Sequence, residues 1–162
     1  MCESDARRLV RTILLALVAA LPACGKKEPR REEPNQAEPS LNLERMVGGA
    51  QNYFETNFDF PTTSSDWTPP STACDGAQRR AHRAAEWKRT PAWDALNFDD
   101  PSFGSGFFYF SYRYTTNGGR KFVVEARADL DCDGKYSLFR RTARADEGQF
   151  RDTDLEITDP LE

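Results

Sequence analysis

Three aspartates on alternate positions are the residues of this sequence whose type and spacing most directly suggest chemistry. They occur in the stretch DLDCDG as Asp129, Asp131 and Asp133, and Gly134 closes the stretch. Carboxylates at alternate positions before a glycine match the first half of a calcium-binding loop, in which the chain folds back around the ion. Calcium is therefore the one cofactor that the sequence suggests.

The second half of such a loop does not match. Arg140 stands where a calcium loop needs a bidentate glutamate, so a site here would have to be completed by Ser137 or by a backbone carbonyl. The other interpretation is a sharp turn between two strands, because Asp and Gly are good turn residues. Both interpretations stay open, and the turn is favoured.

Catalytic chemistry has little support in the sequence. His82 is the single histidine, and it lies in a basic, alanine-rich segment with no nucleophile to pair with. The adjacent carboxylates Asp99 and Asp100 belong to NFDDPS, which is typical of a turn. We therefore predict that the protein is not an enzyme.

Length and charge narrow the class of protein further. A chain of 162 residues has room for one modest domain, and its formal net charge of −4 comes with basic residues scattered among carboxylates. Phosphate binding needs a clustered basic face, so we predict no nucleic-acid partner.

The N-terminus has the pattern of an export signal. Three arginines at positions 7, 8 and 11 precede an apolar run that is too short to span a bilayer. The run ends in LPAC, with Leu21 three residues before Cys24 and the small Ala23 just before it, which resembles the lipobox of bacterial lipoproteins. The resemblance implies a signal peptide over 1–23 and acylation of Cys24; an ordinary signal with a chance cysteine is the alternative.

Residues 24–40 form the second predicted region, which comprises the lipidated cysteine and a disordered linker rich in proline and charge. Gly25 in place of aspartate resembles the pattern of lipoproteins sent to the outer membrane. We therefore expect a lipid anchor in the cell envelope, with the membrane as one partner and the protein facing the periplasm or the cell surface.

The cysteines then sort by position. Cys2 leaves with the signal and Cys24 takes the lipid, so Cys74 and Cys132 remain as a pair in an oxidising compartment. We predict a disulfide between them.

The predicted globular domain, 41–162, begins with an amphipathic helix over 40–58, capped by Ser40 and facing a sheet across Gly48 and Gly49. An irregular loop follows. Residues 77–89 suggest a basic helix, and a short helix begins at Pro91 with Thr90 as its cap.

The strands lie in the C-terminal half. A hairpin is indicated by the aromatic stretch 107–116, the turn Asn117–Gly119 and the stretch 120–128. Residues 135–145 supply a third strand. The predicted fold class is α+β, with the N-terminal helix packed on an antiparallel meander of three to four strands.

Several stretches, taken in their order along the chain, resemble the soluble domain of type IV pilins and pseudopilins. They are GGAQNYFETNFDFP, the Trp87–Phe98 segment, FYFSYRY and ARADLDCDGKYSLF. The resemblance implies a helix across an antiparallel sheet and, in some pseudopilins, a calcium loop at the acidic turn. It covers about Leu41 to Phe139, but the prepilin peptidase site and the long apolar helix of that family are missing.

Two functions follow as expectations. The first is a pilin-like lipoprotein with a structural or accessory role in type IV pilus or type II secretion machinery, whose proteins would be its partners. The second is a surface-tethered module that binds a ligand or a glycan, with calcium as a stabilising ion.

Overall fold

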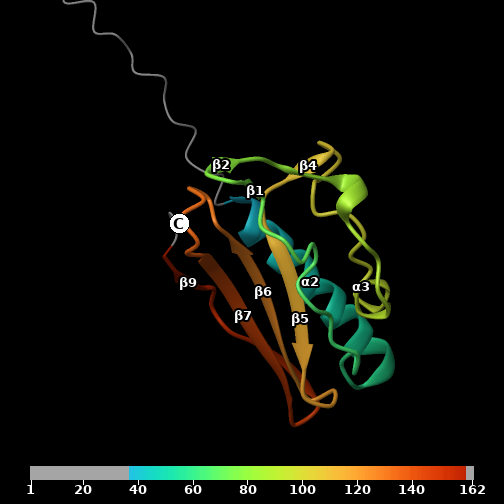
Figure 1. Cartoon of the computed structure of the whole chain (residues 1–162). Coiled ribbons are helices and arrows are strands. Elements are labelled where there is room, and N and C mark those ends of the chain that lie inside the picture. Colours follow the sequence, from blue (N-terminus) through green and yellow to red (C-terminus); the bar gives the residue numbers. More distant parts are fainter. Residues whose placement is uncertain (1–36, 160–162) are drawn as a thin grey trace, which may run out of the picture. The chain divides into compact units, whose positions relative to one another are not determined.

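The computed structural model describes residues 37–159, which lie within one compact unit, Glu33–Glu162. Helix α2, Ala37–Asn57, is the one helix of seven or more residues in this part of the chain (Figure 1). It begins three residues earlier than expected, so Ser40 lies inside its first turn and does not cap it. Its buried residues recur at three- and four-residue steps, which turns one face of the helix inward; they include Leu43, Met46, Val47, Ala50 and Phe54.

The main sheet is antiparallel and has five strands. Its strands follow the order β5-β6-β7-β8, and β9 pairs with the part of β7 that β8 leaves free. The expected hairpin is present as β5 and β6, joined through the Asn117 turn, and the third strand is present as β7. The bounds are Ser111–Thr116 for β5, Lys121–Ala128 for β6, Ser137–Asp146 for β7, Gln149–Asp152 for β8 and Glu156–Thr158 for β9.

Two small sheets stand where a basic helix was expected over 77–89. That prediction is wrong: the segment holds β2 and β3, followed by a 3-10 turn at Ala84–Glu86. Strand β1, Cys74–Asp75, pairs with β2, Gln78–Arg79, and β3, His82–Arg83, pairs with β4, Phe107–Phe108. Tertiary pairing of β3 with β4 outweighs the helical preference of the alanines and arginines.

The short helix α3, Pro91–Ala95, confirms the other half of that prediction. The Thr90 hydroxyl accepts a hydrogen bond from the backbone N–H of Trp93 at 3.4 Å. Proline at the first helical position loses no hydrogen bond, because that N–H has no partner inside a helix.

The predicted fold class is wrong. An α+β fold with a three- to four-stranded meander was expected. The described chain is instead mostly sheet: about 33% of it is strand, arranged in several antiparallel sheets, and about 24% is helix. The prediction missed β8 and β9, which extend the main sheet, and the two small sheets, because these strands are only two to four residues long. Strands this short have no detectable alternation, so their pairing defines them. Strands β1–β2 and β7–β8 pair across short turns, and β3–β4 and β7–β9 pair across longer stretches of chain.

Helix α2 lies across one face of the main sheet (Figure 1), and one hydrophobic cluster joins them. The inward face of β6 contributes Phe122, Val124 and Ala126 to that cluster. Because successive side chains of a strand point to opposite faces, the residues between them lie on the other face of the sheet. The candidate site lies on that opposite face.

The glycine pair of α2 has a different neighbour from the one expected. A Cβ on Gly49 would overlap with the carbonyl oxygen of Leu96, just after α3, whereas a Cβ on Gly48 would meet nothing within 4 Å. The close approach is therefore between two helices, at Gly49 alone, and not between α2 and the sheet.

Within residues 37–159, no helix has the length and the apolar character that crossing a membrane requires. The signal peptide, Cys24 and most of the linker fall outside the described residues, so their predictions stay predictions.

Candidate functional site

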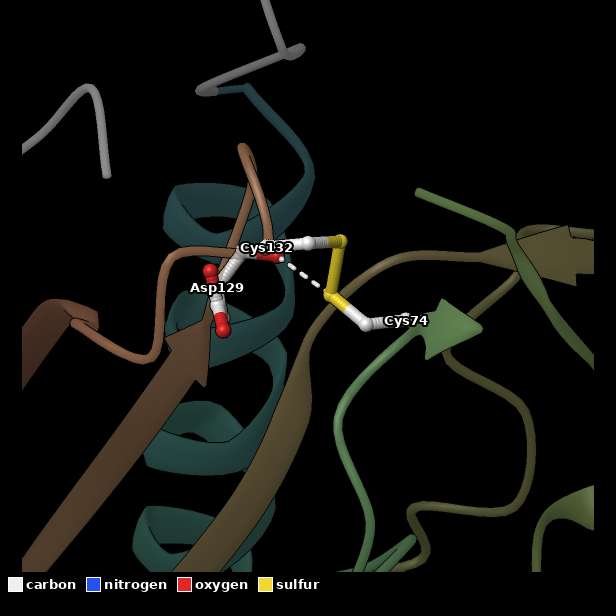
Figure 2. Close-up of side chains that lie close together, drawn as sticks. All are labelled: Cys74, Asp129 and Cys132. Atoms are coloured by element: carbon white, nitrogen blue, oxygen red, sulfur yellow. Dashed lines mark hydrogen bonds between the residues drawn. A yellow bond between two sulfur atoms is a disulfide. The ribbon is translucent and has the colours of Figure 1, made fainter. Parts of the chain in front are cut away.

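The disulfide between Cys74 and Cys132 is present, as predicted. It joins β1 to the turn after β6, with 5.8 Å between the two Cα atoms (Figure 2). The Cys74 sulfur also lies 3.3 Å from the backbone carbonyl oxygen of Asp129. A disulfide sulfur carries no proton, so this is a close sulfur–oxygen contact and not a hydrogen bond. The bond ties the irregular first half of the domain to the sheet.

The acidic stretch forms a turn between β6 and β7 that its own carboxylates hold. Asp129 is buried, and its two carboxylate oxygens accept the backbone N–H groups of Asp133 at 3.1 Å and of Gly134 at 3.0 Å. Cys132 has φ of 65° and Gly134 has φ of 93°, so the turn needs two left-handed residues. A glycine adopts such a conformation at little cost, which explains its place at the end of the stretch.

The fit to calcium is incomplete. One carboxylate oxygen from each of Asp129, Asp131 and Asp133 lies within 4.8 Å of the others, so the three predicted ligands converge. However, Asp129 already accepts the turn's amides, and Asp133 accepts from the Lys135 ammonium at 2.8 Å, a bond that lowers the pKa of Asp133. Ser137, the fourth predicted ligand, is fully buried at the start of β7. Calcium needs six to eight oxygens, so calcium binding here stays a prediction.

A second group of ligand-type atoms, from Cys74, Asp129 and Cys132, also lies within 4.8 Å. Metal binding by cysteine requires the thiolate. Both sulfurs are committed to the disulfide, so this group cannot bind a metal while the bond is intact.

A row of polar side chains crosses the main sheet on the face opposite α2. Backbone pairing places Arg113, Glu125, Arg140 and Glu156 directly opposite one another on four neighbouring strands. The bridge between Thr68 and Tyr112 adds Trp67 to the end of the row, beside Arg113. Cross-strand neighbours on one face lie close enough to interact.

Glu125 holds the two arginines of this row in fixed positions. Its side chain is only 3% exposed, and each carboxylate oxygen takes two N–H groups from one guanidinium. The Nε of Arg113 lies 2.9 Å from one Glu125 carboxylate oxygen, and the Nε of Arg140 lies 3.0 Å from the other. One carboxylate lies between two guanidiniums, so this trio carries a net charge of +1, and Glu156 lies beside Arg140 at the end of the row. Neither guanidinium makes another hydrogen bond within residues 37–159, so their remaining Nη donors can meet an outside acceptor.

Stacking fixes a third arginine beside the row. The guanidinium carbon of Arg127 lies 4.3 Å from the ring centroid of Trp67 and 4.9 Å from that of Tyr136, while that of Arg113 lies 4.5 Å from Trp67. Arg127 donates to the carbonyl of Pro70 at 3.3 Å, and its Nε has no hydrogen-bond partner among the described residues. Burial lowers the pKa of Arg127. We call Trp67, Arg113, Glu125, Arg127, Tyr136 and Arg140 the arginine face.

The whole outer side of the sheet is basic, although the chain as a whole is acidic. The strand registers place six basic and three acidic residues there, a net charge of +3 against −4 for the full chain. The basic residues are Arg113, Lys121, Arg127, Arg140, Arg144 and Arg151, and the acidic ones are Glu125, Asp146 and Glu156.

Sequence reasoning missed the arginine face. Its members come from a loop, three strands and a turn, and the register alone brings them together. A signal was present, since Arg113, Glu125 and Arg127 alternate with apolar residues on two predicted strands. That alternation identifies an outward face but not which residues of neighbouring strands meet on it.

The residues considered for catalysis have structural roles. Asp100 accepts the backbone N–H of Ser102 at 2.7 Å, which confirms the turn at NFDDPS. His82 is fully buried in β3. That the protein is not an enzyme stays a prediction.

Comparison of the chain with protein-family models, with curated proteins and with solved structures found no match. The resemblance to type IV pilins therefore stays a prediction, and the proposals below depend on the sequence and the geometry.

Proposed function

We propose that this protein is a lipid-anchored module of the cell envelope that binds an acidic glycan on its arginine face. The orientation of Arg113 and Arg140 by the buried Glu125 is the observation that carries the proposal. Two guanidiniums held before a ligand arrives lose little conformational freedom on binding, which favours affinity. Planar guanidiniums match carboxylate groups in particular, because they donate two parallel hydrogen bonds.

The aromatic rings beside the arginines favour a sugar chain as the carrier of those carboxylates. Tyr136 is 39% exposed and lies next to Arg127, so the face offers a partly exposed aromatic ring as well as charge. The disulfide agrees with placement outside the cytosol, where such bonds persist.

Binding to a polyuronate tests the ligand class. We expect the full-length chain to bind polygalacturonate and not neutral dextran, with affinity that falls as salt rises. Arg113→Gln and Arg140→Gln should each weaken binding about tenfold, which corresponds to about 1.4 kcal/mol for a lost charged contact. Titration calorimetry measures this.

Arg89→Gln is the matched control, because Arg89 is an exposed arginine that pairs with Asp94, outside the main sheet. Equal loss in the control, equal binding to dextran, or equal binding to single-stranded DNA of the same charge would each contradict the proposal.

Anchoring at Cys24 has a separate test. We expect wild-type protein to sediment with membranes and Cys24→Ser to be released. Mass spectrometry of the mature N-terminus should find an acylated cysteine at position 24, and an intact leader would refute the anchor.

The predicted accessory role in pilus or secretion machinery stays a second proposal that depends on the sequence resemblance. Crosslinking in intact envelopes tests it, and we expect pilus or secretion components among the products if it is right. If no pilus or secretion components are crosslinked and the protein binds the glycan, only the proposal of a glycan-binding module remains.

A further inference from the structure

The point where the chain from Cys24 enters the domain is tied to one end of the fold. The Glu38 carboxylate, in the first turn of α2, accepts the backbone N–H groups of Tyr109 at 3.0 Å and Phe110 at 3.1 Å, and the Tyr112 hydroxyl at 3.0 Å. Burial raises the pKa of Glu38, against the effect of these bonds. The first turn of α2 is therefore fixed to the segment that follows β4.

Exposed apolar side chains gather around this entry point. Leu41 is 49% exposed, Phe103 is 53% exposed and Phe107 is 56% exposed. Leu41 lies three residues after Glu38, Phe107 lies two residues before Tyr109, and the Phe103 ring is 5.0 Å from the guanidinium of Arg45, one turn beyond Leu41. Three of the six exposed large hydrophobic residues of the described chain are thus linked, by sequence or by contact, to the first half of α2. A cluster of this kind marks an interaction surface.

Two arginines border these side chains. Arg83 lies opposite Phe107 in the β3–β4 pairing, so the two share a face, and the Arg79 guanidinium lies 5.2 Å from the Tyr109 ring. No ion pair of Arg79 or Arg83 is present among residues 37–159. We call Leu41, Arg79, Arg83, Phe103 and Phe107 the entry patch.

The short stretch of chain between Cys24 and α2 favours the membrane as the partner of the entry patch. Only 12 residues lie between Cys24 and Ala37, so the two positions can be at most about 45 Å apart when the chain is fully extended. Among the described residues, those at the start of α2 are the closest along the chain to the anchor. Surfaces that combine aromatic and aliphatic side chains with arginine bind the boundary between lipid headgroups and acyl chains, and arginine adds attraction to anionic lipid.

We propose that the entry patch rests on the anionic lipid bilayer that holds the acyl chains of Cys24. The inference depends on the proposed anchor but not on the glycan ligand. The patch would hold the domain in one orientation on the membrane.

Photo-crosslinking in intact envelopes tests this contact. Phe103 and Phe107 are replaced, one at a time, by p-benzoylphenylalanine in the full-length protein, and lipid adducts are measured by mass spectrometry after irradiation. Phe58→p-benzoylphenylalanine is the matched control, because Phe58 is 78% exposed and follows the opposite end of α2. That helix of 21 residues separates the two ends by about 30 Å.

We expect at least fivefold more phospholipid adduct from positions 103 and 107 than from position 58. A second pair of variants, Arg79→Gln and Arg83→Gln, should reduce the adduct at 107 at least twofold. Equal yields at 58 and 107, or adducts at 107 with protein alone, would overturn the proposal.

The same samples report on the anchor. An unacylated Cys24 would refute the proposed anchoring and, with it, this inference, whatever adducts form at 107. An acylated Cys24 without lipid adducts at 103 and 107 would refute the patch and leave the anchor intact.

Discussion

At the scale of single residues, His82 gives the domain a pH-dependent stability. The ring is fully buried against Phe108 with 5.2 Å between centroids, and its Nδ1 lies 3.4 Å from Glu86. Burial lowers the pKa of His82 below its ordinary 6.5 and outweighs Glu86, which raises that pKa, while Arg80 adds a smaller lowering effect. The unfolded chain therefore binds the proton more readily, so the contribution of His82 to stability is complete above about pH 6.5 and is lost as the pH falls toward the folded pKa.

We expect the free energy of unfolding of the wild type to fall between pH 7.5 and pH 5 and that of His82→Leu to fall less. His82 is the only histidine, so the difference between the two proteins reports on His82 together with its partner Glu86, whose pKa His82 lowers. The raised pKa of Glu38 acts with the opposite sign, because its ionisation costs stability as the pH rises, but it is common to both proteins. Urea titrations at several pH values measure the difference, and parallel curves would contradict the expectation.

At the scale of elements, the contact between α2 and α3 depends on one glycine of an adjacent pair. Gly49→Ala places a methyl group against the Leu96 backbone, which cannot move without α3, so we expect a loss of about 1–3 kcal/mol in the free energy of unfolding. Gly48→Ala meets open space and removes the cost of glycine in a helix, so it should gain about 0.5–1 kcal/mol. Urea unfolding of both variants measures the pair, and equal effects would show that the helices do not approach at Gly49.

At the scale of the whole molecule, the disulfide limits how far the loop before α3 can separate from the sheet. Cys74 and Cys132 are 58 residues apart, so their bond closes a long loop in the unfolded chain. The chain-entropy model gives about 4 kcal/mol for a loop of this length. We expect the Cys74→Ser/Cys132→Ser double variant to lose about that much stability and to be insensitive to reductant, whereas the wild type should approach it when reduced. An unchanged urea midpoint in the double variant would contradict this.

Short-range patterns in the sequence determined several elements correctly. The Thr90–Pro91 start of α3, the hairpin at Asn117 and the apolar stripe of α2 all depend on residues close together in the chain. The pairing of Cys74 with Cys132 also followed, because signal and lipobox patterns accounted for the other two cysteines.

Only the tertiary structure decided the fold class, the small sheets and both candidate surfaces. Strands β3 and β4 pair with each other although α3 lies between them in the chain, and local preference cannot reveal such a pairing. Trp67, Arg113, Glu125 and Arg140 meet through register, and Glu38 reaches the amide of Tyr109 from 71 residues away. Periodicity along a chain indicates which face of an element a residue occupies. Contacts between distant segments depend instead on satisfying hydrogen bonding and burial across the whole fold at once. No single stretch of sequence therefore determines which distant segments meet.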